Sequence, residues 1–153
     1  MWIGNHIVFS TFDPATGKQT QIHSIDDPEW FLMNWTLSSD GHTLALAKKH
    51  RTPLAADILL ADLQGGKQRT VLLGNWFSIG CLDFAADGKS IWVNAASPEG
   101  VQTMLHVTLR GKVIPALEEK EMDLGWAIPS PNGRDVAIWM SAASSNAYLL
   151  EDF

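Results

Sequence analysis

Residues 35–46 read Trp35-Thr36-Leu37-Ser38-Ser39-Asp40-Gly41-His42-Thr43-Leu44-Ala45-Leu46. An Asp-Gly pair separates two short apolar runs here, and such a pair supplies the positive backbone φ that a tight β-hairpin turn needs. After the turn, side chains alternate with period 2, as they do in a strand that buries one face. The stretch therefore predicts a β-hairpin that turns at Gly41.

The same pattern recurs twice along the chain, in residues 82–93 and 126–138. The turn glycines lie 47 and 45 residues apart and are Gly41, Gly88 and Gly133. A second series of glycines, each followed by Lys, interlaces with the first. Its members lie 49 and 45 residues apart and are Gly17, Gly66 and Gly111. Two series with one period predict a repeated unit of about 46 residues.

Each unit is predicted to hold four strands, which we name a, b, c and d. In the second unit they fall near residues 33–38, 43–48, 57–62 and 68–73. The segment Leu54 to Leu63 is open to a helical reading, because Ala and Leu dominate it and only Ile58 is β-branched. We favour a strand, because Ile7 to Asp13 and Met104 to Leu109 occupy the same place in the repeat.

Four antiparallel strands in 40 to 45 residues are typical of a β-propeller blade. The repeat resembles the WD40-like blades of the TolB type, in which a Ser-Pro-Asp-Gly-like turn joins strands a and b. Residues 38–41, 85–88 and 130–133 carry that turn as Ser-Ser-Asp-Gly, Ala-Ala-Asp-Gly and Ser-Pro-Asn-Gly. Residues 125–153 are similar to the last blade of propellers attached to bacterial Ser/Thr kinases and winged-helix regulators. The resemblance implies a sensing or scaffolding module rather than a catalyst.

The expected fold is all-β: a partial propeller of about three four-stranded antiparallel blades within one domain of 153 residues. We expect half a blade (strands c and d) in 1–30 and full blades in 31–75 and 76–121. Residues 122–153 are expected to form a blade without its last strand, whose c strand ends at Phe153. The total is about 13 strands, whereas a monomeric propeller needs about four blades to close.

An open arc leaves unpaired strand edges, which are prone to pair with other chains. Three arrangements would cover them. The missing blades may belong to a longer chain, several copies may close head to tail, or loops may cap the arc. We expect a homo-oligomer, in which two copies would make a ring of about six blades, because heterologous contacts are satisfied only when a ring closes.

In such blades the b–c and d–a connections share one end, which we call the loop face, and the a–b and c–d turns share the other. Longer connections carry function more often than tight turns. The candidate binding residues on the loop face are Trp30, Phe31, Trp76, Phe77, Lys48, Lys49, His50 and Arg51.

The Trp-Phe pairs would form an aromatic platform, or they wedge between blades as core. The basic run would receive an acidic peptide or phosphate, or it is a solvated loop. Trp92 and Trp139 are expected to pack between blades.

Other kinds of chemistry lack the residues they need. The net charge of −6 has the wrong sign for a nucleic-acid partner, and no apolar run approaches the length of a membrane span. Cys81 is the single cysteine, and the five His residues do not fall at the spacing of a helical zinc pair. No serine lies in a nucleophile elbow. We therefore expect no catalytic residue, metal or cofactor.

The favoured function is a non-catalytic interaction, scaffolding or ligand-sensing module that presents its loop face to a protein, peptide or small ligand. Its rival is an accessory propeller domain of a hydrolase, a peptidase or a sugar-active enzyme whose catalytic part lies elsewhere. A remnant with no role beyond folding is a third possibility. Without an export signal the expected location is the cytoplasm, or the periplasm if an N-terminal signal has been truncated.

Overall fold

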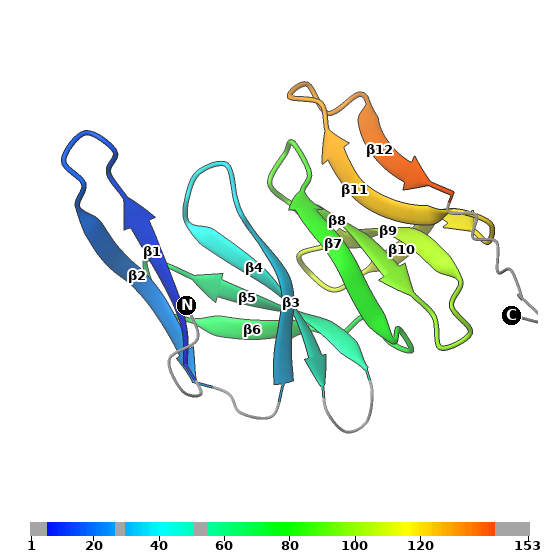
Figure 1. The fold of residues 1–153 in the computed structure, drawn as a ribbon, viewed down its shortest axis with the longest axis horizontal. Helices are drawn as coiled ribbons and strands as arrows, with labels where there is room; N and C mark the ends of the chain where they lie inside the picture. Colours follow the sequence, from blue (N-terminus) through cyan, green and yellow to red (C-terminus); the bar gives the residue numbers. More distant parts are fainter. Residues whose placement is uncertain (1–5, 27–29, 51–54, 143–153) are drawn as a thin grey trace, which may run out of the picture.

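The structure is a computed structural model that describes residues 6–26, 30–50 and 55–142 (Figure 1). These residues form strands and turns, and none of them belongs to a helix that could cross a membrane. The strands are β1 (His6–Phe12), β2 (Gln19–Asp26), β3 (Trp30–Leu37), β4 (Thr43–His50), β5 (Ala56–Asp62), β6 (Gln68–Val71), β7 (Ser78–Phe84), β8 (Ser90–Ala96), β9 (Gln102–Thr108), β10 (Val113–Glu119), β11 (Asp123–Pro129) and β12 (Val136–Ser141).

The strands form four antiparallel sheets, each in chain order. Two sheets are complete blades, β3-β4-β5-β6 and β7-β8-β9-β10, and two have a pair of strands each, β1-β2 and β11-β12. The sheets follow one another as an arc, with β1-β2 at one end and β11-β12 at the other (Figure 1). The expected fold class, a partial propeller of four-stranded antiparallel blades, is confirmed.

The open question about residues 54–63 is settled in favour of a strand. Six consecutive residues of β5, from Ala56 to Ala61, are buried. Ile58 and Leu60 belong to the core shared with β7-β10, whereas Leu59 and Ala61 belong to the core shared with β1-β2. A strand covered on both faces reads as a continuous apolar run, and this is why its sequence lacks the period-2 signal.

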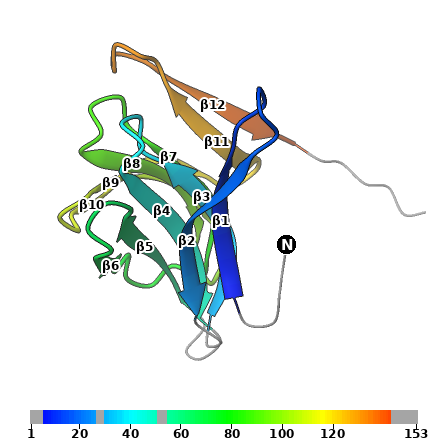
Figure 2. The ribbon, with the colours of Figure 1, turned by 90° about the vertical axis from the view of Figure 1, so that its left-hand side faces the viewer.

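Neighbouring blades are joined along their first strands, as Figure 1 shows for β3, β7 and β11. The Asn34 side-chain amide donates to the Gly80 carbonyl at 3.1 Å, and the Thr36 hydroxyl donates to the Asp83 carboxylate at 3.0 Å. In Figure 2, which looks along the arc, β1 and β2 lie in front of β3, β4 and β5. The largest core fills the space between the two complete blades.

The glycine turns have the expected geometry. Gly41 has a φ of 73° and donates to the Ser38 carbonyl, and Gly66 has a φ of 66° and donates to the Asp62 carbonyl. Both turns lie at one end of the blade, because the Leu63 amide donates to the His42 carbonyl at 2.9 Å. The other end is therefore the loop face.

The two tryptophans expected between blades differ. Trp92 is half-buried, stacks on His106 with 4.7 Å between ring centroids, and packs towards β11-β12. Trp139 is 58% exposed, so the described residues of one chain do not pack it between blades, contrary to the expectation. It lies on the face of β11-β12 that points away from β7-β10, where the described part of the chain provides no further sheet. The predicted c strand ending at Phe153 lies outside the described residues.

Candidate binding surface

The loop face is organised by the connection between β6 and β7. Its Trp76 carbonyl accepts a bond from the Ala56 amide at 2.9 Å, and its Phe77 amide donates to the Ala96 carbonyl at 2.8 Å. The first bond reaches back to the preceding blade, and the second reaches β8 of its own blade. These backbone bonds hold the Trp76-Phe77 pair at the boundary between the two blades.

A cation and an aromatic ring meet at this boundary. The Lys49 ammonium lies 3.6 Å from the centroid of the Phe77 ring, so a side chain of β4 covers the start of the next blade. Cation–π contacts of this kind contribute about 0.5–1 kcal/mol at exposed sites. Phe31 pairs with Lys49 across β3 and β4 and is exposed. Phe31, Lys49 and Phe77 therefore come from three strands or connections but share one area of the loop face.

The rest of the basic run is engaged with the protein itself. His50 lies with Nε2 3.0 Å from the Asp57 carboxylate, and that buried carboxylate also accepts the Leu73 amide at 3.1 Å. Asp57 thus ties β4, β5 and the β6–β7 connection together. Lys48 donates to the Thr70 hydroxyl at 3.2 Å. Arg51, the fourth residue of the run, lies outside the described residues.

A hollow of about 660 Å³ opens beside the connection. It lies between the two complete blades, and its walls are Ala55, Gly74, Asn75, Trp76, Ser97, Pro98 and Glu99. Trp76 packs partly against the core and shows its remaining surface to the hollow. Asn75 and Glu99 are exposed polar residues from the β6–β7 and the β8–β9 connections. The hollow therefore presents one aromatic and several polar groups to solvent.

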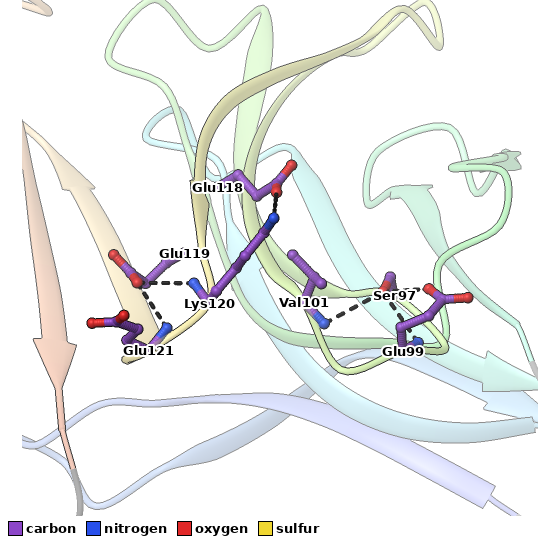
Figure 3. A network of polar contacts seen from close by, with 7 residues as sticks. All are labelled: Ser97, Glu99, Val101, Glu118, Glu119, Lys120 and Glu121. Atoms are coloured by element: carbon purple, nitrogen blue, oxygen red, sulfur yellow. Dashed lines mark hydrogen bonds and ion pairs between the residues drawn. The ribbon is translucent and has the colours of Figure 1, made fainter.

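The loop that carries Glu99 is held by its own side chains (Figure 3). The Ser97 hydroxyl donates to the Glu99 carboxylate at 2.7 Å and accepts the amides of Glu99 and Val101. The hydroxyl bond, more than any other contact, holds the pKa of Glu99 below its ordinary value. Glu99 is therefore a fixed negative charge at neutral pH on the wall of the hollow.

A second acidic group lies at the end of β10 and in the turn that follows it (Figure 3). The Glu119 carboxylate accepts the amides of Glu121 at 2.9 Å and Lys120 at 2.8 Å, and these bonds hold the pKa of Glu119 below its ordinary value. The Lys120 ammonium lies 3.5 Å from the Glu118 carboxylate in an exposed ion pair. The loop face is thus basic and aromatic near β4 and acidic near β10.

The structure corrects one predicted binding residue and leaves the others that it describes at least partly exposed. Trp30 is 4% exposed and packs in the core with Phe9 and Ile25, so its side chain cannot contact a ligand. For Trp30 the alternative reading, in which the aromatic side chain packs as core, is therefore the correct one. Binding by Phe31, Trp76, Phe77 and the described basic residues stays a prediction. Asn75 and Glu99 were missed because each is an ordinary loop residue until the blades pack side by side.

Two features of the described ranges bear on metal binding and thiol chemistry. No three His, Cys, Asp or Glu side chains among these residues are grouped so that they could hold a metal ion. Cys81 is buried, and this burial raises the pKa of its thiol, so it is not a ready thiolate.

Comparisons with known proteins agree with the propeller fold. No family model matches the sequence, and no curated protein matches it. Among solved structures, TolB from Acinetobacter baumannii superimposes with a TM-score of 0.62 over 93% of this chain, at 16% sequence identity. The described sheets have the fold of a partial β-propeller, similar to that of TolB. A putative 6-phosphogluconolactonase from Bacteroides fragilis superimposes on this partial propeller with a TM-score of 0.57 over 88% of the chain, at 13% identity.

The partial propeller spans only 36% of the TolB chain and 41% of the other chain. At these identities the likeness is one of fold and does not extend to activity. The narrower resemblance to propellers of kinases and winged-helix regulators stays a prediction.

Proposed function

We propose that the partial propeller is a non-catalytic interaction module that binds a peptide segment of a partner protein on its loop face. The observation that carries the proposal is the hollow of about 660 Å³ between the two complete blades, with Trp76 in its wall. Partly exposed Trp residues in pockets are common anchors of protein interfaces. The contact between Lys49 and Phe77 stands nearby on the same face.

The turn end of the blades has few groups that could bind a ligand, and this contrast favours the loop face as the binding surface. At the turn end, side-chain carboxylates are used within their own turns: Asp13 accepts from Ala15 and Thr16, and Asp62 accepts from Gln64 and Gly65. These short turns leave few polar groups free for a ligand. The loop face instead carries longer connections, which accommodate binding residues more readily.

The charges on the loop face suit a peptide that bears both signs. Lys49 is near the Phe77 side of the boundary, whereas Glu99 is on the wall of the hollow. A peptide carboxylate would complement the first and a basic or amide donor the second. Complementary charges of this kind contribute mainly to specificity and to the association rate.

Selection from a peptide library displayed on phage, with the full chain immobilised, tests the proposal. Selected peptides are then measured against the unchanged protein and the variants Glu99→Lys and Lys49→Glu. Each variant is expected to weaken binding about tenfold or more, which is about 1.4 kcal/mol. Lys67→Glu, at the turn end, is the matched control and should bind like the unchanged protein. Thermal unfolding by circular dichroism verifies that all variants fold.

Two results would count against a binding loop face. One is that no peptide is enriched in the selection. The other is that the selected peptides bind equally to Glu99→Lys and Lys49→Glu but lose affinity for Lys67→Glu.

A further inference from the structure

The first end of the arc exposes positions that are buried inside it. In β7, Leu82 lies three residues and Phe84 one residue before Ala85, whose carbonyl accepts the bond of the turn. Leu82 is 3% exposed and Phe84 is 6% exposed, because β3-β4 cover them. The equivalent residues of β3 are Trp35 and Leu37, which are 50% and 41% exposed. In the described part of the chain, only β1-β2 lie on that side of β3-β4, so the two inner strands of a blade are missing there.

A cleft of about 420 Å³ marks the place of those two strands. It runs between β1 and the face of β3-β4, and its walls include Val8, Phe9, Leu32, Trp35, Leu37 and Leu44. Phe9 and Trp35 meet edge to face across it, with 5.4 Å between ring centroids. The cleft is mainly apolar, with His6, Ser10, Thr11 and Gln19 also in its lining, and it borders the edge of β1 that β2 does not pair with.

The other end of the arc shows the reverse arrangement. β11-β12 supply the inner two strands of a blade, and Trp126, Ile128 and Trp139 are 50%, 57% and 58% exposed there. Trp139 lies four residues after Asp135, whose carbonyl accepts the backbone bond that closes its turn. The equivalent residues of the complete blades, four after Thr43 and four after Ser90, are Ala47 and Asn94. These two are 0% and 4% exposed because the next blade covers them. Trp139 therefore occupies a blade-packing position for which the described residues provide no neighbouring blade.

We propose that these two ends bind each other in different copies of the chain: β12 pairs with β1 of a second copy, so that β11-β12 and the second copy's β1-β2 form one four-stranded blade. Each end supplies the pair of strands that the other lacks. The exposed aromatic face of β11-β12 enters the apolar cleft of the second copy. The contact repeats the packing already present between the complete blades, and it does not depend on the proposed peptide binding.

The complete blades define the register of the shared sheet. Ala47 pairs with Ile58 in one, and Asn94 pairs with Met104 in the other. Trp139 on β12 has the position of Ala47 and Asn94, four residues after the bond that closes the turn between the first two strands. Phe9 on β1 has the position of Ile58 and Met104, four residues before the turn between the last two strands. Trp139 thus lies opposite Phe9 of the second copy, beside that copy's Trp35. By the same count, Met140 lies opposite Val8.

Two such contacts close a symmetric dimer, because each copy offers both ends. The ring then holds about six blades. The mass in light scattering should be twice the 16.8 kDa of the chain.

Trp139→Lys should raise the dissociation constant about 30-fold or more, as is usual for a buried aromatic anchor at an interface. Leu72→Lys is the matched control, because Leu72 is 71% exposed and lies outside the proposed contact. It should leave the dimer unchanged.

A mass of one chain at protein concentrations up to about 100 µM would overturn the proposal. An unchanged dissociation constant in a folded Trp139→Lys protein would overturn it too.

Disulfide formation between copies tests the register. In a Cys81→Ala background, Val8→Cys and Met140→Cys proteins are mixed and oxidised, since directly opposed residues of paired strands are close enough for a disulfide. A covalent dimer is expected only in the mixture. Thr11→Cys with Met140→Cys is the matched control, because three residues displace the cysteines by about 10 Å.

Equal crosslinking in both mixtures, or none in either, would contradict the pairing of β12 with β1. The second result would instead leave the β12 edge to residues 143–153 or to another chain.

Discussion

The indole of Trp139 on β12 lies against Gly125 on β11, so close that a Cβ atom added to Gly125 would lie 2.7 Å from Cζ3 and 2.9 Å from Cδ2 of the indole. The indole therefore needs a residue without a side chain at this position of the paired strand. This contact lies within one sheet. It explains why residue 125 is a glycine, although its backbone does not have a positive φ.

Gly125→Ala is expected to destabilise the protein by about 1–3 kcal/mol, because the added methyl group forces the indole or the strand to move. Urea unfolding followed by fluorescence measures the change. In a Trp139→Ala background the same substitution should cost much less, since its obstacle is gone. An equal cost in both backgrounds would contradict the contact.

Gly88→Val should destabilise by about 1–2 kcal/mol for a different reason. Gly88 has a φ of 65°, and a Cβ atom there would have nothing within 4 Å, so the cost comes from the left-handed backbone alone. Gly88→Asn is the matched control, because Asn tolerates this conformation better than Val does. Equal melting temperatures for the Val variant and the unchanged protein would count against the turn geometry.

Asp57→Ala should destabilise by about 1–3 kcal/mol, because it leaves the buried Leu73 amide without its acceptor. The same change releases the β6–β7 connection next to the hollow, so amide exchange at Leu73 should become faster. Asp57→Asn keeps an acceptor oxygen and should lose less stability. Unchanged exchange at Leu73 in the Ala variant would show that the carboxylate does not hold the connection.

Stability should fall in acid partly through Asp62. The amides of Gly65 and Gln64 hold the pKa of Asp62 below its ordinary value of 3.8. Because the folded-state pKa is the lower one, the contribution is complete above about pH 4 and is lost as the pH falls through the folded-state pKa. Asp62→Asn cannot titrate, so its melting temperature should change less steeply than that of the unchanged protein below about pH 4. Parallel curves would contradict this role.

The sequence was sufficient for the parts of the fold that are determined locally. The turns at Gly41 and Gly66 were predictable, because an Asp-Gly or Gly-Lys pair and its neighbours make all the required bonds within a few residues. The strand β5 was ambiguous, because burial on both faces removes the alternation that distinguishes a strand from a helix.

The parts that depend on neighbouring blades were less predictable. Trp30 and Phe31 are adjacent in sequence, yet one is core and the other is 47% exposed. Trp139 has the position of a packing residue, but the part of the chain that the structure describes places no blade beside it. The hollow next to Trp76 is assembled from loops of two blades, so no single stretch of sequence contains it.

The bonds between blades also bear on how the chain folds as it is made. Asn34 and Gly80 are 46 residues apart, and Thr36 and Asp83 are 47 apart, so a blade is joined to the next over about one repeat of chain. Closing a loop of this size costs about 1 kcal/mol less than bringing the two ends of the 153-residue chain together would. Each blade can therefore dock on the one before it soon after leaving the ribosome. Both complete blades can be assembled once residue 119 has emerged, before β11 and β12 exist.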